Sequence, residues 1–257
     1  MRVFDIAFDY LLDTTPPGKD PDSHCPRLKA DHQLLWKKEL SDGQLFDLEV
    51  PEDPKVRRKN YLIFKQTPDT WFTVGSDAIT NSYTRWGRPK ALVEAKAELS
   101  EEQKRRYFNP PYTIGSAMIW PVRTIHLPTL NTARGMRIRI ADRMDLTLEC
   151  VRRHYAEEPG SPLADVATNY ADFFELFGTF TQFVEFFHFQ DLVTPEGKIA
   201  FFLEENEDRV FTRPGVPVTK DEYIMLREAS LKFIALRGNR MADWVEKNHS
   251  DIEIRRQ

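Results

Sequence analysis

The sequence is poor in cysteine and lacks the long apolar runs that mark membrane proteins. Cys25 and Cys150 are the only cysteines in 257 residues, so we expect neither a disulfide framework nor a cysteine-based zinc site. Such sparing use of cysteine is typical of a reducing compartment. No stretch approaches the roughly 18 apolar residues of a membrane span, and residues 1–10 contain Asp5 and Asp9 where a signal peptide would be apolar. We therefore expect a cytoplasmic protein with no membrane segment.

An excess of positive charge and the common catalytic motifs are also missing. The formal net charge is −4 and the isoelectric point is near 5.9, whereas general nucleic-acid binders are usually basic. The chain has no Walker loop, dinucleotide fingerprint, nucleophile elbow or kinase motif set. His126 has no companion ligands at metal spacing, which argues against a zinc site. His32 is interpreted as a packed or capped histidine, and no metal site is expected.

The composition is that of a globular protein with a large core and many ordered loops. Hydrophobic residues make up 41% and charged residues 30%, with 18 phenylalanines and 17 prolines. Predicted strands concentrate in residues 1–125 and predicted helices in residues 126–257. This order favours an α+β fold in one domain, 1–257, with a small, mostly antiparallel sheet packed under a larger layer of helices.

Periodicity and turn residues predict the main elements. Residues 61–66 and 71–74 form a predicted hairpin, and residues 112–120 a strand interrupted by Gly115 and Ser116, where a bulge or a close backbone approach is expected. Residues 198–203 are predicted as a strand. A last helix is predicted to start after a cap at Thr219 and to run to about Asn248. Helices over 163–177 and 179–191 carry a broad phenylalanine stripe that is typical of core packing.

The stretch 131–155 combines helical periodicity with a high density of charge. An apolar stripe at helical spacing is predicted to face the core, and it comprises Ala141, Met144, Leu148, Val151 and Tyr155. A second stripe one residue later carries Asp142, Asp145, Glu149 and Arg152. The residues before this helix, 131–135, are predicted to form a polar turn.

The carboxylates of the second stripe repel one another, and only Glu149 has arginines at the following turn. Asp142 and Asp145 therefore need a cation from elsewhere, and Asp191 is a candidate partner for an arginine of this helix. Two interpretations stay open. The charges form either an internal network of arginine–carboxylate pairs or a ligand-binding and catalytic site, because both arrangements perturb charged groups.

Four segments resemble a known family across nearly the whole chain: PPGKDPD near the start, YTIGSAMIWP in the middle, LNTARG followed by IADRMDLTLECVRRHY, and FVEFFHFQDLV. Together they resemble a family of uncharacterised bacterial proteins, a domain of unknown function. The resemblance implies a bacterial cytosolic protein. It implies no activity and no catalytic residue.

The first functional hypothesis is a nucleotide-using enzyme of the transferase type, such as a toxin or phage-defence effector. Arginine forks match phosphate oxygens, so the predicted phosphate-holding residues are Arg134, Arg143 and Arg152. Asp145 or Glu149 would orient or deprotonate the acceptor. Further predicted ligand-binding residues are Lys19, Ser76, Asp77, Gly115, Ser116, Asn131 and Gly135. The nucleotide, for example NAD or ATP, or a nucleic-acid-derived molecule would be the substrate.

The second hypothesis is a non-enzymatic binding or interaction protein. The charges of 131–155 would then be structural, and the phenylalanine-rich helices would partly expose an apolar patch for a protein partner or a homodimer. A third reading makes Asp142, Asp145 and Glu149 magnesium ligands. It ranks last, because catalytic magnesium sites usually gather ligands from several elements.

Overall fold

The structure, a computed structural model, describes residues 2–52, 62–67, 70–79, 89–108, 111–123, 128–203 and 210–256. Within them, four antiparallel strands form one sheet in the order β2-β3-β4-β5, and a parallel pair joins β1 to β6. The strands are β1 (Arg2–Asp5), β2 (Leu48–Glu49), β3 (Leu62–Lys65), β4 (Trp71–Ala78), β5 (Ala117–Val122) and β6 (Ile252–Arg255). The predicted α+β class, with a small antiparallel sheet and a larger helical layer, is confirmed.

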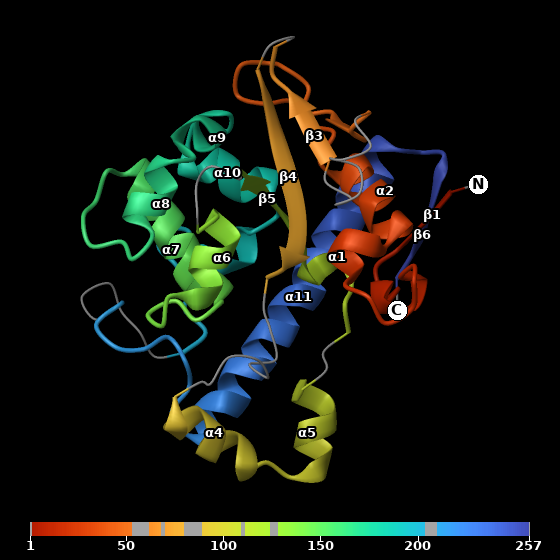
Figure 1. Cartoon of the computed structure of the whole chain (residues 1–257). Helices are drawn as coiled ribbons and strands as arrows, with labels where there is room; N and C mark the ends of the chain where they lie inside the picture. The colour runs from red at the N-terminus through yellow and green to blue at the C-terminus, as the bar shows by residue number, and fades with distance from the viewer. Residues whose placement is uncertain are drawn as a thin grey trace.

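Helices surround the sheet on both sides (Figure 1). Those of the first half are α1 (Pro21–His24), α2 (Pro26–Leu35), α4 (Lys90–Ala97) and α5 (Glu101–Phe108). Those of the second half are α6 (Leu130–Met136), α7 (Met144–Tyr155), α8 (Ala164–Thr168), α9 (Ala171–Glu175), α10 (Phe180–Phe186) and α11 (Lys220–Asn248). Short 3₁₀ turns cover Tyr10–Asp13, Ile114–Ser116 and Gln190–Leu192. No helix in the described part of the chain is long and apolar enough to span a membrane.

The sheet forms because apolar side chains alternate along its strands. In the β3–β4 hairpin, Leu62 pairs with Val74 and Phe64 with Phe72, and all four are buried. The predicted hairpin is therefore confirmed on both sides of its turn. Strand β5 continues the antiparallel pairing as far as Ala78 opposite Ala117. In Figure 1 the end of β4 lies between α1 on one side and α6 on the other.

Helix α11 is the longest element, and its predicted boundaries are confirmed. Thr219 caps it by accepting a hydrogen bond from the backbone N–H of Glu222. The Glu222 carboxylate in turn accepts from the N–H of Val218 at 2.8 Å, which completes a reciprocal cap. The helix crosses the molecule diagonally, and α4 packs against its first turns (Figure 1).

Gly115 lets the backbone approach α11 closely. A Cβ atom at this position would lie 2.2 Å from the carbonyl oxygen of Ile234 and 3.1 Å from the backbone nitrogen of Gly238. The close approach predicted from the sequence is therefore present, and the approaching group is a helix backbone. The role of Gly115 toward a ligand stays a prediction.

The phenylalanine stripe packs inside the molecule. Phe177 lies at the centre of a ring cluster, with centroid distances of 5.4 Å to Phe183, 4.9 Å to Phe186 and 5.0 Å to Phe187. These rings and Phe173 are buried. The interaction hypothesis expected these phenylalanines to expose an apolar patch. This prediction is wrong, because their rings are buried in the core.

Three local predictions are also wrong. Residues 131–135 lie inside α6 and do not form a turn. Residues 198–203 form no strand and contribute only a single bridge between Val193 and Ile199. The helix of the charged stretch starts at Met144, because Ala141 and Asp142 have φ values of 51° and 64°, a left-handed conformation that ends helical periodicity.

Candidate functional site at the end of strand β4

The carboxylate of Asp145 is enclosed by protein donors. Its two oxygens accept hydrogen bonds from two nitrogens of the Arg143 guanidinium, from Nε at 3.1 Å and from Nη2. The backbone N–H of Phe202 donates to the same carboxylate at 2.8 Å. Both charged side chains are at most 1% exposed. Asp145 is thus bound by Arg143, two residues earlier in the chain, and helical spacing does not predict such a pair.

Asp142 pairs with Arg134, 2.6 Å away. The left-handed turn at residues 141–142 folds the chain back, so that the N–H of Asp142 donates to the carbonyl of Arg134 at 3.0 Å. Arg134 is fully buried, donates to the carbonyl of Ile79 at 2.9 Å and lies over the Trp120 ring. The guanidinium of Arg134 therefore links α6 to the turn that follows it and to the end of β4.

Glu149 is bound by the two arginines that the sequence offered. Arg152 donates to it at 2.8 and 2.9 Å and Arg153 at 2.6 Å. Arg152 also pairs with Glu158 at 2.6 Å, and these carboxylates raise its pKa above the ordinary value. Asp191 pairs with Arg240 of α11, at 2.5 Å, so the predicted link from Asp191 to the charged helix is wrong.

The remaining predicted residues have different environments. Lys19 lies in an exposed loop. The Ser116 hydroxyl donates to the carbonyl of Thr113 at 2.7 Å. Gly135 faces open space on α6. The acids of 131–155 and the arginines at positions 134, 137, 143, 152 and 153 have protein partners, as the ion-pair interpretation expects, and their roles toward a ligand stay predictions.

Three of the predicted residues meet at the end of β4, and a fourth, Ser76, is next to one of them in the strand and has partners of its own. Ser76 and Asp77 belong to the last part of this strand, and Asn131 lies on α6. The amide of Asn131 donates to Asp77, which also accepts from the N–H of Ala78 at 2.8 Å. Arg134 donates to the side-chain oxygen of Asn131 at 3.1 Å. The buried Arg134 therefore fixes the side chain of Asn131, which in turn fixes the carboxylate of Asp77.

Asp22 of α1 completes this cluster, although its position in the sequence gave little indication of it. Its Oδ1 accepts hydrogen bonds from the hydroxyls of Ser76, at 3.0 Å, and of Tyr112. Among the described residues, none bonds to Oδ2. Burial raises the pKa of Asp22 well above its usual range, and the negative charges of Asp77 and Asp20 raise it further.

Tyr112 is the second residue that sequence patterns missed. Burial raises its pKa well above that of a free tyrosine, and the charges of Asp22 and Asp77 add to this effect. The phenol therefore stays protonated and donates to Asp22. The PPGKDPD segment indicated an ordered loop, but only the tertiary fold shows that α1 packs against β4.

His32 extends the chain of hydrogen bonds inward from Ser76. The Trp36 indole donates to Nδ1 of His32 at 2.8 Å, so the histidine proton is placed on Nε2, which lies 2.9 Å from the Ser76 hydroxyl. Burial lowers the pKa of His32 to about 3, which keeps the ring neutral. His32 is packed, as interpreted from the sequence, and it also orients Ser76 to donate toward Asp22.

The cluster holds two acidic groups in different states of hydrogen bonding. Asp77 is fixed by two N–H donors, whereas Asp22 accepts two O–H donors on Oδ1 and, among the described residues, none on Oδ2. Pairs of carboxyl groups whose environments differ in this way commonly divide the roles of acid and base. No group of three His, Cys, Asp or Glu side chains in the described segments is placed to hold a metal ion.

The fold and this cluster define an α+β protein with a two-carboxylate centre at a strand end. The chain belongs to a family of unknown function, DUF6994, whose model matches residues 4–241. The match includes every residue of the cluster. Comparison with curated proteins and with solved structures gives no match.

Proposed function

We propose that the protein is an enzyme of the transferase or hydrolase type that acts on a nucleotide-containing substrate at the cluster around Asp22 and Asp77. The observation that carries the proposal is that no described residue bonds to Oδ2 of Asp22. A carboxyl group whose pKa is raised keeps its proton to a higher pH than a free aspartate does, and Oδ2 is where this proton can be donated to a substrate.

The two acids fit the cleavage of a glycosidic bond. Asp22 would give its proton to a departing purine base as the bond to the sugar carbon breaks, and Asp77 would stabilise the positive charge that develops on the sugar. Water or an acceptor hydroxyl would then add to that carbon and release its own proton. Tyr112 and Ser76 hold Asp22 in place. Asn131, fixed by Arg134, holds Asp77. The phosphates would then contact groups other than Arg134, Arg143 and Arg152, whose guanidinium groups have protein partners.

The expected setting is the cytoplasm of a bacterium, and a toxin or phage-defence effector is one role in which such chemistry would serve. ATP and GTP are the first substrates to test, because a purine base leaves readily only when it is protonated. NAD tests the same kind of bond without this demand, because nicotinamide leaves as a neutral base and takes no proton.

Base release from NAD, ATP and GTP, followed by chromatography, tests the reaction. With ATP and GTP, Asp22→Asn and Asp77→Asn should each lower the rate by about 10²-fold or more, the usual contribution of a general acid or base. Asp251→Asn, at an exposed carboxylate, is the matched control and should leave the rate unchanged. Equal rates in all three variants would contradict the acid–base roles.

Thermal unfolding with each nucleotide at millimolar concentration tests binding separately. A ligand present at 100 times its Kd stabilises the folded state by about 2.7 kcal/mol, so the melting temperature should rise with at least one of them. If none raises it and no base is released, a nucleotide substrate is excluded.

One observation supports a non-enzymatic interaction protein as the second candidate. The acids of 131–155 are paired with Arg134, Arg143, Arg152 and Arg153 within the protein, as a purely structural role for this segment predicts. A homodimer or protein partner would then bind elsewhere on the surface. Intact partner binding in Asp22→Asn and Asp77→Asn, together with no base release by the wild type, would favour this candidate.

A further inference from the structure

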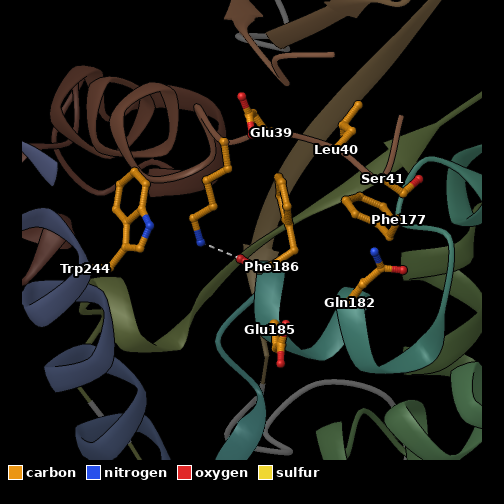
Figure 2. A pocket seen from close by; sticks show the side chains of 9 residues that line it. Glu39, Leu40, Ser41, Phe177, Gln182, Glu185, Phe186 and Trp244 are labelled. Atoms are coloured by element: carbon orange, nitrogen blue, oxygen red, sulfur yellow. Dashed lines mark hydrogen bonds between the residues drawn. The ribbon is translucent and has the colours of Figure 1, made fainter. Parts of the chain in front are cut away.

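Lys38 lies at a second site, away from the β4 cluster, where it lines a pocket of about 300 Å³. Figure 2 shows this pocket between Trp244 of α11, Phe186 and Gln182 of α10, and the segment that contains Glu39 and Ser41. The backbone of Lys38 is fixed, because its carbonyl accepts from the N–H of Phe46 at 2.8 Å. The side chain therefore enters the pocket from a well-defined position.

The amine of Lys38 has two protein acceptors. Its Nζ donates to the carbonyl of Phe186 at 2.6 Å and lies 2.7 Å from Nε2 of His188. Burial lowers the pKa of His188 to about 2, and the charges of Lys38 and Arg237 act in the same direction. The histidine is consequently neutral and accepts through Nε2. Two acceptors satisfy both N–H groups of a neutral amine and leave its lone pair without a donor.

The rest of the surroundings are aromatic or positively charged. The Nζ atom lies 4.8 Å from the centre of the Trp244 ring and 5.2 Å from that of Trp36. No carboxylate in the described part of the chain forms an ion pair with it. Burial lowers the pKa of Lys38 well below that of a free lysine, and the charge of Arg237 lowers it further. Desolvated lysines whose pKa is lowered act as nucleophiles more readily than exposed lysines do.

From this pocket and these contacts we infer that Lys38 is a reactive amine that forms an imine with a small, uncharged aldehyde or ketone. The nitrogen adds to the carbonyl carbon, one amine proton moves to the carbonyl oxygen, and loss of water leaves the carbon–nitrogen double bond. No oxidant or reductant is needed. Glu39 and Glu185, both exposed at the rim, disfavour an anionic carbonyl compound.

A reductive-trapping experiment tests this site on the intact wild-type protein. The folded chain is treated at pH 7 with low concentrations of glyceraldehyde and cyanoborohydride, and the modified lysines are located by peptide mass mapping. Lys38 should be modified at least 10-fold faster than its neighbour Lys37, which is exposed and pairs with Asp47 at 2.7 Å. Glyoxylate, the anionic probe, should label Lys38 less than glyceraldehyde does.

The opposite order would overturn the inference. If Lys37 is labelled and Lys38 is not, the amine serves only to clamp the carbonyl end of α10. Because the assay maps the wild type, it does not depend on a variant that folds. Lys38→Arg, compared with Lys37→Arg, adds a second measurement: only Lys38→Arg should abolish the fast phase of labelling.

Discussion

The buried fork between Arg143 and Asp145 shows how much a single residue of the charged stretch can matter for stability. The pair is enclosed, and the N–H of Phe202 depends on the same carboxylate. Removing one member of a buried pair leaves the other charge without compensation, which costs far more than the pair itself contributes. At the surface the same chemistry has little effect, because water and salt screen the charges.

Asp145→Ala should therefore lower the free energy of unfolding by about 3–5 kcal/mol, as measured by urea denaturation. The matched control is Asp165→Ala. Asp165 accepts a similar fork from Arg137 at 2.6 and 2.8 Å, but its side chain is 69% exposed. The control should change stability by at most about 1 kcal/mol. A loss below 1 kcal/mol for Asp145→Ala would show that Arg143 finds another partner or water.

Elements whose ends are marked by local chemistry were predictable from the sequence. The cap at Thr219 and the alternation of Phe64 and Leu62 depend on near neighbours, so α11 and the β3–β4 hairpin were found. The start of α7 was not, because two non-glycine residues adopt positive φ at 141 and 142. That conformation is stabilised by Arg134, a tertiary partner, and periodicity does not reveal such a partner.

Two glycines test how tightly elements approach one another. Gly115→Ala should push the 3₁₀ turn Ile114–Ser116 away from α11, because the new Cβ would lie 2.2 Å from the carbonyl oxygen of Ile234. We expect the free energy of unfolding to fall by about 1–3 kcal/mol, the usual cost of overpacking. Gly135→Ala meets no atom within 4 Å and should stabilise α6 by up to about 1 kcal/mol. Chemical denaturation of both variants measures the difference. Equal effects would mean that the two elements have room to separate.

When the described residues are considered together, several buried basic groups form no ion pair with a described carboxylate. One of them, Arg237, donates to the backbone carbonyls of Phe187, Gly115 and Ala117 and contacts the sulfur of Met118. Its charge lowers the pKa of His32 and His188 beyond the effect of burial. The sequence shows each of these residues, but their convergence from α2, α10 and α11 follows only from the packed fold. The site roles of Asp22 and Tyr112 were not predicted either, because their contacts also form only in the packed fold.

This arrangement predicts a loss of stability in acid. The pKa values of His32 and His188 are lowered from 6.5 to about 3 and about 2, so the unfolded chain binds these protons first. Their contribution to stability is complete above pH 6.5 and is lost as the pH falls, at up to about 1.4 kcal/mol per pH unit for each group. Asp22, whose pKa is raised, acts in the opposite direction: its contribution is present at low pH and is lost as the pH rises.

Unfolding free energies measured in urea between pH 7 and pH 4 check this prediction. The wild type should lose stability steadily below pH 6, and His32→Gln should show a smaller loss per pH unit. A variant with the same slope as the wild type would show that His32 becomes protonated in the folded state without penalty.

The parallel pairing of β1 with β6 sets an order on folding during synthesis. Arg2 pairs with Ile252 and Phe4 with Ile254, so during synthesis β1 waits for a strand that is made about 250 residues later. At about 5–20 residues per second this wait is roughly 12–50 s. Phe4, fully buried in the finished protein, lacks its strand partner for that time. The N-terminal segment is therefore where we expect a nascent chain to need the protection of a chaperone.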